Sequence, residues 1–212
     1  MFSHYLDILN NIYDNGYNIY NSNFIEIVGV PGVGKTTLIK NLKTLYPGIT
    51  CRDEPVEKWQ NSKLFQNKDL FDIQFQITID LLFGDHLYNN KFLISNFVAT
   101  YAHTRYKYEM NIITKEQYDF FVDNIYSKIK LNSHKCIILK VDSPELIIER
   151  MNKRDKDYDR INRNNNYINS LNKHIYDIIN EYKIKFLVID SSKSELEVCA
   201  NVIKSIDYFS NN

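Results

Sequence analysis

Residue types that bind phosphate groups stand together in the first quarter of the sequence. Gly29, Gly34, Lys35 and Thr36 match the pattern GxxxxGK[ST] without a mismatch. The glycines let backbone N–H groups point into one concavity, the lysine adds a charge for the β- and γ-phosphates, and the threonine hydroxyl is a Mg²⁺ ligand. We therefore expect ATP to bind here. The expected contacts are with Gly29, Gly32, Val33, Gly34, Lys35, Thr36 and Thr37.

The surroundings of this motif support the same interpretation. An apolar run at Phe24–Val28 predicts a buried strand before the loop, and Leu38, Ile39 and Leu42 follow it at helical spacing. A strand, a glycine loop and a helix are the structural context that the motif requires. The alternative is a glycine-rich turn that binds nothing. Because every position matches after a strand, we favour nucleotide binding.

Other apolar runs predict four more strands, separated by helical patterns. They lie at Ile49–Cys51, Phe92–Ser95, Cys136–Val141 and Phe186–Ile189. Strands alternating with helices predict an α/β fold, a parallel five-stranded sheet with helices on both faces. The run at Ile49–Cys51 leads into Glu54, so we expect a carboxylate at the sheet edge where such folds place their catalytic residues. A helix over about Leu64–Phe83 should form one wall of the pocket.

A segment dense in both signs of charge, about residues 149–163, lies between the last two expected strands. The usual structure of such a run is a solvated helix surface. Beside a triphosphate site, its cations have a second use as a mobile lid over the phosphates. We favour the lid, and the solvated helix surface stays the alternative.

The length of 212 residues suits one α/β domain, 1–212, in which residues 1–22 form an N-terminal helical extension. The 26 basic and 26 acidic residues cancel, which argues against a nucleic-acid partner held through its phosphates. Three cysteines without metal-like spacing suit a reducing compartment. No apolar run is long enough to span a membrane, so we expect a cytoplasmic protein without a membrane partner.

Several short motifs resemble those of one known family. The hexapeptide EPVEKW at residues 54–59 follows the second expected strand, and Phe75-Gln76 form an FQ pair. Residues 141–150 look like an xxSPExxxxR strand and helix, and Tyr167-Ile168 stand where a YL pair is expected. Together these motifs resemble the deoxynucleoside kinases, the thymidine, deoxycytidine and deoxyguanosine kinase group. The resemblance covers about residues 24–191 and implies a phosphate-loop kinase fold with a helical lid.

The resemblance also implies roles for individual residues. Glu54 would be the base that accepts the proton of the nucleoside 5′-hydroxyl, which agrees with the need of phosphoryl transfer for a proton acceptor at the incoming oxygen. Lys35 would assist the transfer at the phosphates. Gln76 would bind the base edge, because an amide both donates and accepts in one plane. The further implied positions are Trp59 beside the base, the lid cations Arg150, Arg154 and Lys156, and Asp159 at the 3′-hydroxyl.

Two departures from the family bear on activity. The family carries Glu-Arg-Ser or Asp-Arg-Ser after its third strand, whereas this chain has Ser95, Asn96 and Phe97. Phe65 stands where the family often has a tyrosine for the 3′-hydroxyl. Because one aimed cation is worth several kcal/mol in phosphoryl transfer, the resemblance supports nucleotide binding more strongly than turnover.

The size of the side chains expected around the base suggests which base is preferred. Ile79, Phe83 and Tyr101 stand at positions that line the base site in the resembled family, and two bulky rings beside Gln76 suggest a tight pocket that favours a pyrimidine. Arg105 could stack on the base or replace part of the missing charge, and His103 is expected on the helix surface.

The leading hypothesis is therefore an ATP- and Mg²⁺-dependent phosphotransferase, a deoxynucleoside kinase that phosphorylates the 5′-hydroxyl. A thymidylate-type nucleoside monophosphate kinase is one rival. A non-catalytic nucleotide-binding relative is the other, because the charges at Ser95-Asn96-Phe97 are missing. The expected partner is a deoxynucleoside substrate. The family tends to form dimers through helices, so a homodimer is also an expectation.

Overall fold

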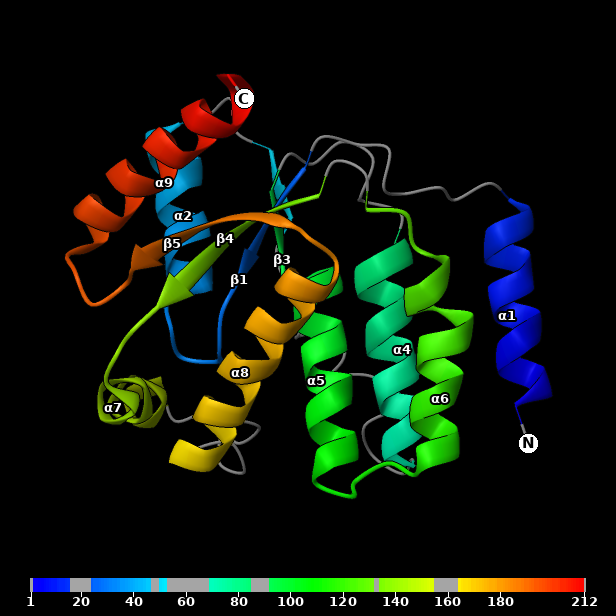
Figure 1. The fold of residues 1–212 in the computed structure, drawn as a ribbon. Helices are drawn as coiled ribbons and strands as arrows, with labels where there is room; N and C mark the ends of the chain where they lie inside the picture. Colours follow the sequence, from blue (N-terminus) through cyan, green and yellow to red (C-terminus); the bar gives the residue numbers. More distant parts are fainter. Residues whose placement is uncertain are drawn as a thin grey trace.

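The computed structural model describes residues 2–15, 24–46, 50–52, 69–84, 92–131, 134–154 and 164–211. At its centre is a five-stranded sheet in the order β2-β3-β1-β4-β5 (Figure 1), and every neighbouring pair is parallel. The strands are β1 (Ile25–Val28), β2 (Cys51–Arg52), β3 (Phe92–Ile94), β4 (Lys135–Lys140) and β5 (Lys185–Asp190). The predicted parallel five-stranded sheet is confirmed.

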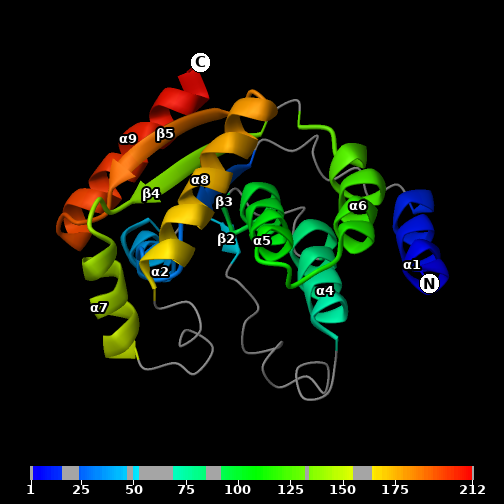
Figure 2. The same cartoon turned by 60° about the horizontal axis from the view of Figure 1, so that its bottom comes forward.

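Helices cover both faces of the sheet, as predicted. α2 (Lys35–Leu45) and α9 (Glu195–Asn211) pack together on one face, and α5 (Phe97–Glu109) and α8 (Asn165–Glu181) pack together on the other (Figures 1 and 2). Beyond α5 stand α4 (Leu70–Phe83) and α6 (Lys115–Asn124), followed by a 3₁₀ turn, η2 (Tyr126–Lys128). α7 (Pro144–Arg154) follows β4. No helix in these described ranges is both long and apolar enough to cross a membrane.

The N-terminal helix α1 (Ser3–Asp14) lies at the outer end of the helical layer, past α6 (Figure 1). Aromatic side chains attach it to the neighbouring helices. The Phe2 ring stacks on Phe120 at 4.7 Å, and the Tyr5 ring meets Phe75 edge-on at 4.8 Å. Aromatic pairs at these centroid distances add favourable energy beyond the area that they bury.

The central strands are buried on both faces because helices cover both sides. All four residues of β1 are buried, and so are Cys136–Leu139 of β4. Such strands read as continuous apolar runs, which explains why the sequence identified them. β2 has only two residues and is half-buried, and it begins two residues after the start of the run that predicted it.

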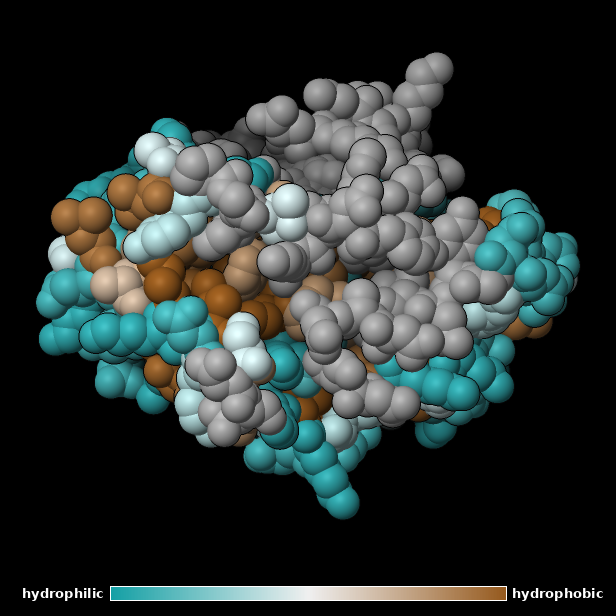
Figure 3. All heavy atoms as spheres, turned by 90° about the horizontal axis from the view of Figure 1, so that it is seen from above, coloured by the Kyte–Doolittle hydropathy of each residue, from teal (hydrophilic) through white to brown (hydrophobic). Residues whose placement is uncertain are grey.

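The edge strand β5 leaves part of its apolar surface exposed. Phe186 and Val188 are 37% and 46% exposed, and hydrophobic atoms appear at the surface on this side of the molecule (Figure 3). A groove of about 540 Å³ lies there, lined by Ile179, Asn180, Lys183, Ile184, Lys185, Phe186, Leu187, Tyr208 and Phe209. It lies at the amino end of β5. Parallel α/β sheets bind ligands at the carboxyl end, so the groove is not the predicted nucleotide site.

Candidate nucleotide and nucleoside site

The predicted phosphate loop connects β1 to α2 at the carboxyl edge of the sheet. Gly32 has a φ of 84°, a left-handed conformation that costs other residues about 1–2 kcal/mol. A Cβ added to Gly29 would lie 2.6 Å from the Leu139 carbonyl oxygen, and one added to Gly32 would lie 2.7 Å from Met151 Cγ. The glycines therefore let the loop pass close to both β4 and α7.

Lys35 is buried at the start of α2, with 9% of its surface exposed. Its ammonium donates hydrogen bonds to the carbonyl oxygens of Gly29, at 2.8 Å, and Val30, at 3.4 Å. The side chain therefore curls back over its own loop. Thr36 and Thr37 are exposed on the first turn of the same helix, so the Thr36 hydroxyl is accessible to a ligand.

Arg150 and Ser191 hold the loop from its other side. The Ser191 hydroxyl donates to the Val33 carbonyl oxygen at 2.6 Å. The half-buried Arg150 guanidinium donates to the Ser191 carbonyl oxygen at 3.0 Å and reaches Val33 O at 3.4 Å. Arg150, predicted as a lid cation, is thus bonded to the backbone of the loop in this structure. The side chain of Arg154 and all of Lys156 lie outside the described residues.

The residues predicted for the nucleoside fall into two environments. Gln76 and Ile79 are half-buried on α4, and Gln76 Nε2 donates to Asp80 Oδ1 at 3.0 Å. Phe83 is 8% exposed and meets Tyr13 edge-on, whereas Tyr101 is 2% exposed and stacks on Tyr126 at 4.1 Å. Gln76 and Ile79 are therefore partly accessible, while Phe83 and Tyr101 belong to the packed core.

The other predicted residues on the acceptor side, Glu54, Trp59, Phe65 and Asp159, lie outside the described residues. The structure does describe Arg52, two residues before Glu54. Its guanidinium donates to the carbonyl oxygens of Asp80 and, at 3.0 Å, Leu81. These carbonyls belong to the last turn of α4, where intrahelical partners are missing and a cation is favourable. Arg52 therefore anchors the strand end that leads to Glu54.

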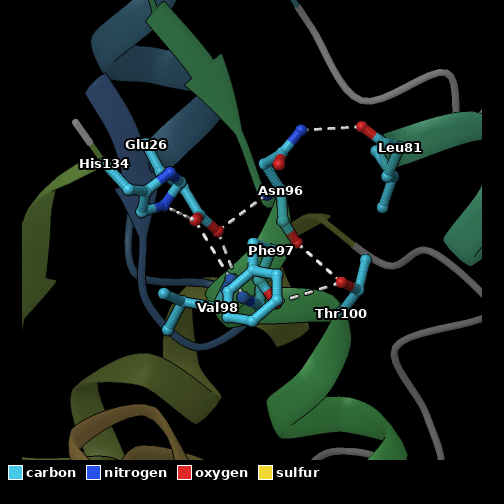
Figure 4. Close-up of polar contacts among 8 residues, drawn as sticks. Glu26, Leu81, Asn96, Phe97, Val98, Thr100 and His134 are labelled. Carbon is cyan, nitrogen blue, oxygen red and sulfur yellow. Dashed lines mark hydrogen bonds and ion pairs between the residues drawn. The ribbon is translucent and has the colours of Figure 1, made fainter. Parts of the chain in front are cut away.

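The third-strand residues that depart from the family are all buried. Ser95, Asn96 and Phe97 are 8%, 1% and 0% exposed. Asn96 Nδ2 donates to the Leu81 carbonyl oxygen of α4 at 2.7 Å (Figure 4). Its amide nitrogen is therefore bonded to another helix in the part of the chain that the structure describes.

Two basic side chains on α5 have lowered pKa values. Burial, together with the positive charges of Lys107 and Lys35, lowers the pKa of His103 to about 3. Burial also lowers the pKa of Lys107 to about 8. His103, expected on the helix surface, is half-buried in the structure. Sequence spacing carries no signal of this burial.

Arg105, for which base stacking was one of two possibilities, contacts a tyrosine of its own helix. Its guanidinium lies 4.4 Å from the centre of the Tyr101 ring and pairs with Glu181 of α8. The cation–π contact holds the guanidinium against its own helix, and the ion pair connects α5 to α8. Arg105 is therefore part of the packing between two helices.

The fold resembles solved enzymes of one kind. A structure of deoxyadenosine kinase from M. mycoides with bound dCTP aligns with a TM-score of 0.68 and 19% identity, over 87% of this chain and 98% of that one. The same enzyme with dCMP and dCDP gives 0.70 and 21%, over 87% and 98% of the two chains. With bound dATP it gives 0.66 and 22%, over 86% and 98%. The TM-scores establish a common fold, and at these identities the likeness shows the fold alone.

The comparison with protein families assigns the sequence more directly. A search of curated proteins finds no match. The family model described as "Deoxynucleoside kinase" matches residues 25–209, which include the phosphate loop, the third strand and α7. This match covers most of the chain. The protein therefore belongs to the deoxynucleoside kinase family.

Proposed function

We propose that the protein transfers the γ-phosphate of ATP to the 5′-hydroxyl of a deoxynucleoside, with Glu54 as the base. As a member of its family, the chain is a phosphotransferase that phosphorylates nucleosides. The observation that supports the specific assignment is the strand order, in which only β3 separates β1 from β2. Neighbouring strands are about 4.8 Å apart, so the strand leading to Glu54 ends about 10 Å from the strand leading to the phosphate loop. In this proposal the sugar alcohol binds between these two strand ends, beyond the carboxyl end of β3.

In the proposed reaction, the Glu54 carboxylate accepts the proton of the 5′-hydroxyl as its oxygen attacks the γ-phosphorus. The bond from the γ-phosphorus to the β,γ-bridging oxygen breaks, and ADP leaves. Positioning and charge neutralisation provide most of the catalysis in such a transfer. Lys35, at the start of α2, is placed to neutralise the phosphates, and the helix N-terminus behind the loop favours the same negative charge.

Mg²⁺ fits this site through Thr36. The threonine hydroxyl is exposed on the first turn of α2, and Mg²⁺ prefers oxygen ligands while retaining several waters. When bound, the ion would offset the charge of the β- and γ-phosphates. Arg154 and Lys156 are the remaining proposed lid cations, because Arg150 is bonded to the backbone of the loop.

For the acceptor, we propose a deoxynucleoside whose base contacts Gln76. The amide is half-buried on α4, which is consistent with a side chain that reaches a ligand. A preference for pyrimidines stays a proposal drawn from the sequence, because Phe83 and Tyr101 are packed into the core in the described structure. The M. mycoides relative, a deoxyadenosine kinase, was solved with both an adenine and a cytosine nucleotide, so purines belong in the test.

The deciding experiment measures transfer of labelled phosphate from ATP to each of four deoxynucleosides, with Mg²⁺. We expect turnover with at least one of them, and the isosteric variant Glu54→Gln should reduce it by about 100-fold or more, because a positioned base is worth about that much. Equal activity of the variant would refute the role of Glu54. Comparable rates with thymidine and deoxyguanosine would refute the pyrimidine preference.

A second candidate is a nucleotide-binding protein without turnover. The buried Asn96 supports it, since no arginine occupies that position and the amide is bonded to α4. This candidate predicts ATP binding without phosphate transfer to any nucleoside. Adding thymidine monophosphate as an acceptor in the same assay tests the thymidylate-type alternative.

A further inference from the structure

A buried carboxylate in the middle of the sheet organises the start of α5. Glu26 of β1 is 0% exposed (Figure 4). One of its oxygens accepts from the backbone N–H groups of Asn96, at 2.7 Å, and Ala99, at 3.1 Å. The other accepts from Val98 N–H at 3.0 Å and shares a 2.8 Å hydrogen bond with His134 Nε2. A carboxylate has about four acceptor sites, and all of them are used.

These four hydrogen bonds account for the burial of the Glu26 carboxylate without a metal ion. Glu26, His134 and Cys136 nevertheless place potential ligand atoms within 4.8 Å of one another. The backbone N–H groups that donate to Glu26 lie at the start of α5, where no intrahelical acceptor exists. A negative charge is also favourable at this end of a helix. The Glu26 side chain therefore caps the N-terminus of α5 from a neighbouring strand.

The consequence concerns the side chain of Asn96. Asparagine at this position of a helix ordinarily caps its own helix, but within the described structure the Asn96 side chain makes no such bond to α5. Its amide instead donates to Leu81 O, the same carbonyl oxygen that accepts from Arg52 Nη1 at 3.0 Å. The start of α5, the end of α4 and the end of β2 thus meet at one oxygen atom.

We infer that Glu26 and Asn96 are positioning residues for the acceptor side of the active site. Glu26 fixes the start of α5, and Asn96 transmits that position to α4, which carries Gln76, and to Arg52, which precedes Glu54. Neither residue touches substrate. This inference rests on the proposed function, because it assigns Gln76 and Glu54 to the acceptor nucleoside.

The phosphate loop is held by a different set of contacts, those of Ser191 and Arg150 with Val33. Loss of the Asn96 bond should therefore weaken nucleoside binding and leave ATP binding intact. A residue needed only for general stability would change both. This difference between the two substrates is what the experiment measures.

The test uses two variants of Asn96 and a matched control. Asn96→Ala removes the amide, and the isosteric Asn96→Asp places an acceptor against Leu81 O. The control is Asn124→Ala in α6, which removes another asparagine amide bonded to a helix carbonyl, that of Phe120 at 3.0 Å. We expect both Asn96 variants to raise the KM for the deoxynucleoside about tenfold and to change the Kd for ATP less than twofold, while the control changes neither. A tenfold change corresponds to about 1.4 kcal/mol.

Arg52→Lys provides a second test of the shared oxygen. Lysine keeps the charge but loses the planar fork that reaches two carbonyls. Because Arg52 and Asn96 donate to the same atom, the effects of Arg52→Lys and Asn96→Ala on nucleoside KM should not be additive. Additive effects would show that the two side chains act separately and would overturn the inference.

Two further results would also overturn it. One is an equal loss of ATP and nucleoside affinity in the Asn96 variants, and the other is an unchanged nucleoside KM. Should the wild type phosphorylate no nucleoside, the proposed function fails, and hydrogen exchange then decides the inference. Asn96→Ala should speed amide exchange in the last turn of α4 and leave the phosphate loop unchanged, and equal exchange rates at α4 would refute the coupling. ATP binding confirms that each variant is folded.

Discussion

The hydroxyl of Ser191, just past the end of β5, donates a 2.6 Å hydrogen bond to the carbonyl oxygen of Val33 in the phosphate loop. The contact joins residues 158 positions apart and fixes the loop to the end of β5, an edge strand of the sheet. We expect Ser191→Ala to lower stability by about 1 kcal/mol and ATP affinity severalfold, because the loop loses a buried hydrogen bond. Titration with ATP and urea unfolding measure both effects. Ser205→Ala, which removes a serine bond to the Asn201 carbonyl in α9, is the matched control and should leave ATP affinity unchanged.

Lys35 is expected to be needed for turnover. Lys35→Met keeps most of the apolar stem but removes the charge that offsets the phosphates, so kcat should fall by about 100- to 1,000-fold, as when an aimed donor is lost from an active site. The exposed Lys40 on the same helix provides the control. If Lys40→Met reduced kcat as strongly, the effect would come from general surface charge and not from the loop.

The two loop glycines should differ in their tolerance of alanine. The added Cβ at Gly29 meets the backbone oxygen of Leu139, which cannot move without disturbing β4. At Gly32, the nearest atom is Cγ of the flexible Met151 side chain, although the φ of 84° still strains an alanine. We therefore expect Gly29→Ala to be the more destabilising, and both to cost more than about 1 kcal/mol. Thermal unfolding gives the order, and the reverse order would contradict this account of the loop.

Lys107 should make stability depend on alkaline pH. Burial lowers the pKa of Lys107 in the folded protein from its ordinary 10.5 to about 8. The charged lysine therefore opposes folding below pH 8, and this penalty fades as the pH rises from 8 to 10.5, where the unfolded chain binds more protons. Lys107→Met should stabilise the protein at pH 7 by about 1–3 kcal/mol.

Urea unfolding at pH 7 and again near pH 10 measures this difference, which should shrink at the higher pH. The exposed Lys130 is the control, and Lys130→Met should shift stability little at either pH. A Lys107→Met protein with the urea midpoint of the wild type at pH 7 would show that the ammonium is well solvated.

The sequence was informative where one local pattern determined the structure. The apolar run before Gly29 and the spacing of Gly29, Gly34 and Lys35 were sufficient for β1, the loop and α2, because each depends on neighbours along the chain. β4 was equally clear, since a strand buried on both faces reads as a continuous apolar run. The two-residue β2 was placed less accurately, because so short a strand has no periodicity of its own.

The side-chain partners could not be predicted in the same way. Asn96 bonds to α4, Arg150 bonds to the loop backbone, and Tyr101 stacks on Tyr126, all through contacts between distant parts of the chain. The sequence did not indicate the role of Glu26, because a single acidic residue in an apolar run has no recognisable partner. Its partners are the backbone N–H groups at the start of α5, which only the three-dimensional structure places next to it. Such partners depend on how helices pack on the sheet, which residue spacing does not encode.

The hydrogen bond from Lys35 to Gly29 O has a consequence for the catalytic cycle. The ammonium has three N–H donors, so a triphosphate that takes one of those directed at the carbonyl oxygens of Gly29 and Val30 competes with a carbonyl, and the measured nucleotide affinity then reflects an exchange of partners. After transfer, ADP offers less negative charge for that competition. The ammonium then returns more readily to its carbonyl, which favours departure of the spent nucleotide.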